Sequence, residues 1–279
     1  MHGAADGAPG LYVDRYADLL VVHADSEPVL DTWRHALPAG GAAIAKIHAR
    51  QANRTHPVEL RLWGHPPDEL TVTERGAHYL IRPQVGLNVG LFLDMREVRS
   101  WLRQHSAGRT VLNLFAYTCA FGVVASLGGA RRVLNLDLAK GYLEWGKANY
   151  AANGLATDDH DFVYGDALDW LQRFVRRHEH FDVVVVDPPS FSTSGFSVER
   201  DYARLVSAAA RVTSPGGMLL AATNHASTTD NRFEAWLRSG LDSAGRRGQL
   251  EQRWHEPAPD FPLVEGQHPH LKVRALTLD

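Results

Sequence analysis

Residues 110–137 have the sequence TVLNLFAYTCAFGVVASLGGARRVLNLD, in which two short runs of β-branched and aliphatic residues flank an apolar helical pattern. A loop of small and aromatic residues separates the first run from the helix. This order predicts a strand, a loop, a helix and a second strand. In an open parallel sheet, ligands bind beyond the carboxyl ends of the strands where the strand order reverses. We therefore expect this first loop to form the floor of a binding crevice.

The second run ends at Asp137, which predicts a carboxylate at the tip of a strand. A carboxylate in this position can accept hydrogen bonds from both hydroxyl groups of a ribose. The preceding loop, YTCAFG at 117–122, lacks the G-x-G-x-x-G spacing that allows a pyrophosphate to approach the backbone. The sequence therefore favours a nucleoside ligand without phosphates.

The chain around this unit alternates between strand-like and helical patterns. Further strand patterns lie at 160–164, 181–186, 218–223, 250–255 and 271–278, and helical patterns at 92–104, 141–153, 166–177, 199–212 and 231–241. The run FDVVVV is apolar without a break, which is typical of a strand buried on both faces. The sequence therefore predicts an α/β fold with a Rossmann-like, doubly wound, mostly parallel sheet and an antiparallel edge hairpin.

The first 90 residues predict a separate small α+β domain. Its strand patterns lie at 11–13, 19–22, 43–48, 58–62, 70–74 and 78–81, with one helical pattern at 27–36. Glycine and asparagine interrupt any regular pattern between residues 83 and 90. We therefore expect residues 1–90 to form a substrate-binding or lid domain and residues 91–279 to form the main domain.

Composition limits the classes of function. A formal net charge of −3 gives no general attraction to polyanions, so nucleic-acid binding would need a local basic patch. The single cysteine excludes an internal disulfide and a cysteine-based zinc site. The fifteen histidines show no spacing typical of a metal site, and the sequence shows neither an export signal nor an apolar run of about 20 residues. We expect a cytoplasmic protein without a metal centre or a membrane span.

Acidic residues follow three of the predicted strands. Asp137 ends the second strand, Asp166 follows the strand at 160–164, and Asp187 follows the strand at 181–186. Because the carboxyl ends of parallel strands meet at one edge of a sheet, these carboxylates are expected to line one crevice. Together they suit a ligand that carries a ribose and an adenine amine.

Structural roles are alternatives for the same residues. Asp137 and Asp166 could be helix caps or loop carboxylates. Pro188 and Pro189 could serve only to end a strand, and Phe191 could be a core aromatic residue. The joint placement of the acids favours ligand binding over these alternatives.

Several segments resemble a known enzyme family. They are LNLFAYTCAFG at 112–122, GGARRVLNLD at 128–137, YLEWGKANYAANGL at 142–155, GDALDWL at 165–171, FDVVVVDPPSFSTS at 181–194, GLYVDRYADLLVVH at 10–23, LNVGLFLDMR at 87–96 and HLKVRAL at 270–276. They are similar to class I S-adenosylmethionine-dependent methyltransferases, and more closely to bacterial 23S ribosomal RNA methyltransferases that form 5-methylcytosine or 7-methylguanine. The resemblance implies S-adenosyl-L-methionine as the cofactor and a methyltransferase domain at residues 91–279.

The resemblance also implies roles for individual residues. Asp137 would bind the ribose and Asp166 the adenine edge, while Asn113 and the loop after it would contact the methionine part. Phe92 and Arg96 would close the site, with Arg96 as the candidate for the methionine carboxylate. The implied catalytic residues are Asp187, Pro188, Pro189 and Phe191, and the implied cofactor-binding residues are Phe92, Arg96, Asn113, Phe115, Ala116, Tyr117, Thr118, Asp137, Leu138, Asp166, Ala167 and Asp187.

The chemistry that the resemblance implies is direct in-line methyl transfer. The segment DPPSFSTS is more similar to the branch of the family that forms 7-methylguanine, and ring N7 of guanine needs no base for attack because its lone pair is free. Forming 5-methylcytosine requires a cysteine thiolate that adds to the ring. The only cysteine, Cys119, lies in the cofactor loop, and Asn224 and His225 follow the strand at 218–223. We therefore expect N-methylation of a base, preferably guanine, in large-subunit ribosomal RNA.

Two other functions stay open. The mildly acidic charge and the lack of the extra amino-terminal RNA-binding domain of the resembled cytosine enzymes favour a small-molecule acceptor, with the small domain as a lid. A non-catalytic RNA-binding or assembly factor that keeps the fold is the second alternative. The expected partner is accordingly RNA, with 23S ribosomal RNA preferred, or a small molecule, and a homodimer is left open.

Overall fold

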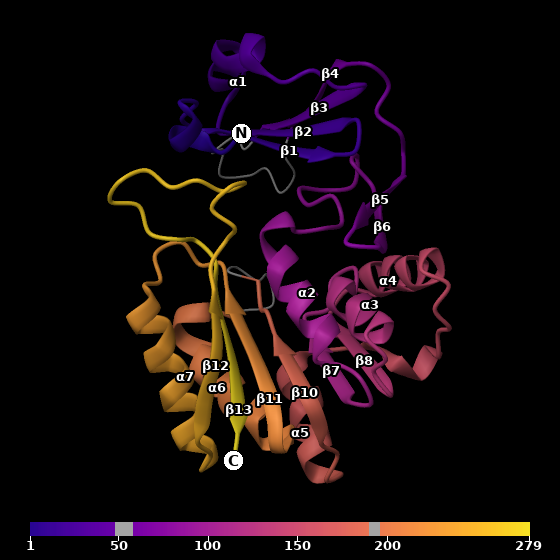
Figure 1. Cartoon of the computed structure of the whole chain (residues 1–279), viewed down its shortest axis with the longest axis vertical. Helices are drawn as coiled ribbons and strands as arrows, with labels where there is room; N and C mark the ends of the chain where they lie inside the picture. Colours follow the sequence, from indigo (N-terminus) through magenta and orange to yellow (C-terminus); the bar gives the residue numbers. More distant parts are fainter. Residues whose placement is uncertain (48–57, 190–195) are drawn as a thin grey trace. The chain divides into compact units, whose positions relative to one another are not determined.

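The computed structural model describes residues 1–47, 58–189 and 196–279, which form two compact units. Unit 1 comprises Met1–Leu93 with Pro257–Gln267, and unit 2 comprises Asp94–Glu256 with His268–Asp279 (Figure 1). The segment 257–267 therefore belongs to unit 1, whereas the sequence analysis assigned all residues after 90 to the main domain. A pattern read along the chain does not reveal that a short loop late in the sequence packs with an early domain.

Unit 1 contains a four-stranded sheet in the order β1-β2-β3-β4. The first two strands form an antiparallel hairpin, β2 and β3 are parallel, and β3 and β4 are antiparallel. The helix α1 (Glu27–Trp33) connects the parallel pair, and its Leu30 is buried against the sheet. The strands are β1 (Leu11–Tyr16), β2 (Leu19–Ala24), β3 (Ala42–Ile47) and β4 (Val58–Trp63), and the short 3₁₀ turns are η1 (Gly3–Asp6) and η2 (Arg34–Ala36).

A second hairpin of unit 1 is formed by β5 (Leu70–Glu74) and β6 (Ala77–Ile81). Its turn consists of Arg75 and Gly76, both with positive φ, which is the conformation that tight hairpin turns require. The predicted strand at 43–48 corresponds to β3, although His48 lies outside the described residues. The α+β character of this unit thus follows from local patterns of alternating residues and turn signals.

Unit 2 is built on a seven-stranded sheet in the order β12-β13-β11-β10-β7-β8-β9. The five strands from β11 to β9 are parallel, and β13 pairs antiparallel with both β11 and β12. This confirms the predicted doubly wound sheet with an antiparallel edge hairpin. The strands are β7 (Thr110–Leu114), β8 (Arg132–Asp137), β9 (Phe162–Tyr164), β10 (Phe181–Val186), β11 (Thr213–Thr223), β12 (Gly248–Trp254) and β13 (Lys272–Leu278).

Helices cover both faces of this sheet. Figure 1 shows α6 and α7 side by side, and with α5 they bury one face of the sheet in an apolar core. The other group, α2, α3 and α4, packs through α3 and α4 against β7 and β8. The helices are α2 (Arg96–Gln104), α3 (Ala120–Leu127), α4 (Lys140–Ala152), α5 (Ala167–Arg176), α6 (Val198–Val212) and α7 (Asp230–Ala244), and the 3₁₀ turns are η3 (Leu93–Met95) and η4 (Asp159–Asp161).

The strand order reverses between β7 and β10. The chain runs outward from β7 through β8 to β9, then returns to the other side of β7 as β10. Loops that leave the carboxyl ends of β7 and β10 diverge at such a reversal and leave room for a ligand. The residues to consider for binding are therefore those that follow β7, β8, β9 and β10.

One detail differs from the sequence expectation. The strand β11 begins at Thr213 rather than at 218, because Thr213 pairs with Phe181 before a register shift, and the turn residues 215–217 lie inside the strand. In the described parts of the chain, no helix is both long enough and apolar enough to cross a membrane.

Candidate functional site

The loop after β7 has an unusual backbone. Phe115, Tyr117 and Cys119 adopt left-handed conformations with φ of 55°, 48° and 59°. A residue other than glycine in this region costs of order 1 kcal/mol, so the surroundings must hold the loop in place. The amide of Ala116 donates to the carbonyl of Leu136 at 2.9 Å, and the amide of Cys119 donates to the carbonyl of Ala116 at 2.7 Å. The loop is therefore fixed to the end of β8.

Asp137 connects this loop to the next helix. Its Oδ2 accepts a hydrogen bond from the amide of Tyr117 at 2.8 Å, and its Oδ1 accepts one from the amide of Ala139 at 2.9 Å. Burial raises the pKa of Asp137 above its ordinary value, although these amides act in the opposite direction. Each carboxylate oxygen has a second lone pair, so Asp137 can also accept bonds from the two hydroxyls of a ribose. Leu138 follows it and is exposed.

Asn113 lies under the loop in a buried polar network. Its Nδ2 donates to Oδ1 of Asn135 at 2.9 Å, and Nδ2 of Asn135 donates to the hydroxyl of Tyr150 at 3.0 Å. Thr118 is also fully buried, and its carbonyl accepts a bond from Asn149 at 2.8 Å. The side chain of Asn113 therefore joins β7 to β8 beneath the loop, and its contact with the methionine part of the cofactor stays a prediction.

Small residues allow the helices to approach this loop closely. A Cβ atom at Gly146 in α4 would lie 2.3 Å from Sγ of Cys119. Cys119 is fully buried, and burial together with the charge of Asp137 raises the pKa of its thiol well above the ordinary value. The thiol is therefore neutral near pH 7 and fills space between the loop and α4.

Asp166 is the N-cap residue of α5. Its Oδ1 accepts bonds from the amides of Leu168 at 2.9 Å and Asp169 at 3.1 Å. The preceding Gly165 donates its amide to the carbonyl of Asp137 at 3.0 Å, which brings the end of β9 beside the end of β8. The capping role thus accounts for one oxygen of Asp166, and the side chain remains exposed at the ligand edge of the sheet. Ala167 is buried as the first residue of α5.

Asp187 follows β10 at the strand reversal. β10 pairs with β7 up to Val186, so the Asp187 carboxylate lies just beyond the carboxyl end of the strand. Burial and the neighbouring charge of Asp94 raise the pKa of Asp187 to about 7, while Arg99 acts in the opposite direction. Pro188 is buried and Pro189 is exposed. The fourth predicted catalytic residue, Phe191, lies outside the described residues.

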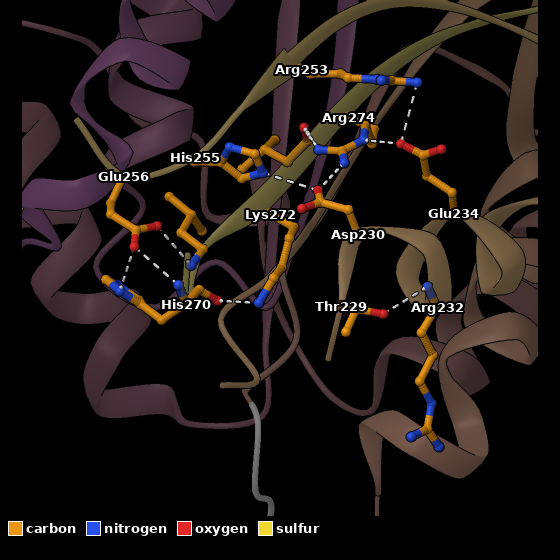
Figure 2. Close-up of polar contacts among 12 residues, drawn as sticks. Thr229, Asp230, Arg232, Glu234, Arg253, His255, Glu256, His270, Lys272 and Arg274 are labelled. Atoms are coloured by element: carbon orange, nitrogen blue, oxygen red, sulfur yellow. Dashed lines mark hydrogen bonds and ion pairs between the residues drawn. The ribbon is translucent and has the colours of Figure 1, made fainter. Parts of the chain in front are cut away.

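Asp94 is a further acid at this edge that the sequence analysis did not select. Its Oδ2 lies 3.2 Å from Nε2 of His270, and its Oδ1 is buried without a hydrogen-bond partner in the described chain. His270 in turn contacts Glu256, with 3.1 Å between Nδ1 and Oε1 (Figure 2). Asp94 belongs to the segment LNVGLFLDMR, but only its neighbours Phe92 and Arg96 were predicted to close the site.

The predicted closing residues are placed in different units. Phe92 belongs to unit 1 and is exposed, whereas Arg96 begins α2 in unit 2 and lies 3.4 Å from Glu97. Within unit 2, the structure brings together the loop at 115–118, Asp137 and Asp166 through shared hydrogen bonds, and places Asp187 close to Asp94. A loop anchored on one acid, an exposed second acid and the two acids Asp94 and Asp187 fit a ligand that offers hydroxyl and amino groups.

Comparisons with known proteins bear on the ligand. A family model described as S-adenosylmethionine-dependent methyltransferase matches residues 35–269. The ribosomal RNA large subunit methyltransferase K/L of a Shewanella species is 41% identical over 232 residues, which cover 76% of this chain and 32% of that protein. The protein of the same name from Shewanella pealeana is 40% identical over 161 residues, which cover 56% of this chain and 22% of that protein. The chain thus spans about a fifth to a third of the length of these curated relatives.

Solved structures are similar over nearly the whole chain. A methyltransferase crystallised with S-adenosylhomocysteine has a TM-score of 0.88 and 30% identity, covering 99% of this chain and 74% of that chain. A protein from Streptococcus mutans assigned as an S-adenosylmethionine-dependent methyltransferase has the same score and identity, covering 99% and 73%. A third, from Agrobacterium tumefaciens, has a TM-score of 0.72 at 18% identity, covering 96% and 87%, and supports the fold alone. The cofactor inferred from the sequence is therefore confirmed.

Proposed function

The chain belongs to the family of S-adenosylmethionine-dependent methyltransferases, and from this premise we propose that it methylates a base of large-subunit ribosomal RNA, preferably at a nitrogen of guanine. The names of the relatives support RNA as the class of substrate, because they are ribosomal RNA large subunit methyltransferases K/L. The reaction would take place in the cytoplasm, where ribosomal RNA is available and a lone cysteine stays reduced.

The burial and raised pKa of the Cys119 thiol support a nitrogen, rather than a carbon, as the methyl acceptor. Methylation of cytosine at carbon requires a thiolate beside the base, and this chain has one cysteine. Cys119 is buried at the N-cap of α3, faces Gly146 and has a raised pKa. Such a thiol is poorly suited to attack a base bound near Asp187. A nitrogen with a free lone pair needs no covalent activation and fits the residues present.

The residues of unit 2 would act mainly by binding and orientation. When bound, S-adenosylmethionine supplies a methyl group on a positively charged sulfur. Asp137 and the loop at 115–118 would hold the nucleoside part, and Asp166 would accept a bond from the adenine amine. Asp187 would bind an edge of the acceptor base, with its carboxylate oxygens accepting N–H groups. Alignment of donor and acceptor by such contacts can supply a large part of the rate enhancement.

Methyl transfer to undermethylated large-subunit ribosomal RNA tests this function. The protein is incubated with the RNA and methyl-labelled cofactor, and the digested nucleosides are identified by mass spectrometry. We expect label in a methylated guanosine, and an Asp187→Asn variant with kcat/KM lowered by about 100-fold or more. Asp182→Asn is the matched control, because Asp182 lies near the amino end of β10, far from the strand end that Asp187 follows, and bonds to Thr110. Label in 5-methylcytosine would contradict the preference for nitrogen.

A small-molecule acceptor is the second candidate. The net charge of −3 favours it, because it provides no general attraction to phosphate groups. Saturable transfer of label to a compound of low mass, without competition from ribosomal RNA, would replace the RNA proposal with this one. Binding of RNA without transfer of label to any acceptor would instead indicate an assembly factor.

A further inference from the structure

Asp94, His270 and Glu256 form a chain of charged groups in unit 2. Glu256 is buried, and its two oxygens accept bonds from the amides of His270 and Leu271, each at 3.0 Å. Its Oε1 also lies 3.1 Å from Nδ1 of His270, whose other ring nitrogen lies 3.2 Å from Oδ2 of Asp94. Figure 2 shows Glu256 and His270 joined in this way. The ring of His270 is therefore held between two carboxylates.

This arrangement keeps His270 positively charged. Burial alone would lower the pKa of the imidazole, but its bonds to Asp94 and Glu256 raise it to about 9. With both ring nitrogens protonated, Nε2 donates to Oδ2 of Asp94 and fixes the orientation of that carboxylate. Among the residues that the structure describes, Asp94 is thus held through Oδ2 alone.

The other oxygen of Asp94 is the feature that needs a ligand. Oδ1 is buried and has no hydrogen-bond partner in the described part of the chain, and the side chain as a whole is 14% exposed. A buried carboxylate oxygen without a partner costs more than 1 kcal/mol, so such atoms commonly mark the place of a bound group. The group that fits is an N–H donor, preferably one with a positive charge.

Asp94 lies near the carboxyl ends of the parallel strands, which is the edge of the sheet where a ligand is expected. Asp94 is close enough to Asp187, at the end of β10, to influence its ionisation. His270 lies just before β13, whose first residue, Lys272, pairs with Thr223 at the carboxyl end of β11. The unpartnered oxygen therefore lies near the strand ends where the family binds its cofactor.

The methionine part of the cofactor ends in a zwitterion. Its carboxylate needs a cation and its ammonium needs an anion. Arg96, two residues after Asp94, is the candidate for the carboxylate, and the turn η3 followed by α2 carries both side chains within one short segment. A carboxylate and a guanidinium at the cofactor site would together match the two charges of an amino acid head group.

We propose that Asp94 binds the α-ammonium group of the cofactor through Oδ1, and that His270 is the positioning residue that orients Asp94 for this contact. The base bound by the enzyme is the other possible source of an amino group. A neutral amine gains less from a carboxylate than an ammonium does, which is why the cofactor is the occupant we assign.

Calorimetric titration with two ligands tests the assignment without reference to methyl transfer. The ligands are S-adenosylhomocysteine and its analogue that lacks the α-amino group. We expect the wild-type protein to prefer S-adenosylhomocysteine by about 10- to 100-fold, which corresponds to a charge-assisted hydrogen bond. Asp94→Asn should lose most of this preference, while its affinity for the deaminated analogue stays within about threefold of wild type.

Two histidine variants separate positioning from a general effect on the fold. His270→Gln should reduce the preference in the same direction, because it removes the link between Asp94 and Glu256. His255→Gln is the matched control: His255 contacts Asp230 at 2.9 Å, and it should leave the preference unchanged (Figure 2).

The ratio of the two affinities decides the outcome, because a general loss of structure would weaken both ligands alike. The assignment is overturned if the wild-type protein binds both ligands equally. It is also overturned if Asp94→Asn keeps the full preference or, where this variant does not fold, if His270→Gln keeps it. The wild-type protein could prefer S-adenosylhomocysteine as expected and yet methylate no RNA. This result would support the role of Asp94 and contradict ribosomal RNA as the acceptor.

Discussion

At the residue scale, Asp137 has a structural role that leaves lone pairs free to bind a ligand. Its carboxylate holds the loop after β7 through the amide of Tyr117 and the start of α4 through the amide of Ala139. The sequence analysis weighed a structural role against ligand binding, but a short carboxylate with several lone pairs can serve both. The same holds for Asp166, which caps α5 with one oxygen and remains exposed.

Some residues of the site could not be found from local sequence. His270 and Asp94 are separated by 176 positions, so no pattern along the chain links them. The resemblance implied that Asn113 contacts the methionine part of the cofactor, and the structure adds that its amide is bonded to Asn135 in the core. Position along a strand predicts which residues lie near the ligand edge, whereas the partner of each polar group depends on the tertiary fold.

The charged ring of His270 predicts a pH-dependent stability. Its pKa is raised from 6.5 to about 9, so its contribution is fully present below pH 6.5 and is lost as pH rises through 9. The pKa of Glu256 is lowered to about 2, because the bond and charge of His270 outweigh burial, so this partner stays ionised throughout that range. We expect His270→Gln to be less stable than wild type by about 1–3 kcal/mol at pH 6.5, discounted for partial exposure of the ring.

Urea denaturation at pH 6.5 and pH 9.5 measures this difference for both proteins. The difference in free energy of unfolding should become small at the higher pH, where wild-type His270 is mostly neutral. A difference that stays constant between the two pH values would show that the ring stabilises the fold without its charge.

At the scale of elements, the loop after β7 and helix α4 depend on each other. Three left-handed residues give the loop its course, and Gly146 in α4 provides the space for Cys119. The sequence analysis predicted the helix and strand here because apolar periodicity is a local property. The close approach of Gly146 to Cys119 was not predicted. A glycine in a helical pattern does not indicate whether a residue from another segment lies against it.

Two glycine substitutions in α4 test this contact. Gly146→Ala places a Cβ atom 2.3 Å from Sγ of Cys119, so we expect a loss of about 1–3 kcal/mol in stability and weaker binding of S-adenosylhomocysteine. Gly141→Ala is the matched control in the same helix, because no atom lies within 4 Å of the added Cβ. This control should be neutral or more stable by up to about 1 kcal/mol. Thermal unfolding and calorimetry measure both effects, and equal behaviour of the two variants would contradict the close contact.

At the scale of the whole molecule, the sheet order explains why distant segments form one site. The reversal between β7 and β10 places the ends of these strands and of β8 at a single edge. The sequence predicted this arrangement because alternating strands and helices allow few topologies, and parallel connections are almost always right-handed. The segment 257–267 was not predicted to join unit 1, because membership of a unit depends on contacts and not on position in the chain.

The central claim is that the cofactor binds at the strand ends of unit 2. Calorimetric titration with S-adenosylhomocysteine tests this claim most directly. We expect saturable binding of one ligand per chain in the wild-type protein, and an affinity lowered by about 10- to 100-fold in Asp137→Asn. Asp161→Asn, which alters an acid bonded to Arg132 at 2.7 Å, should bind as wild type does. Absence of heat with the wild-type protein, or equal binding by Asp137→Asn, would contradict the account.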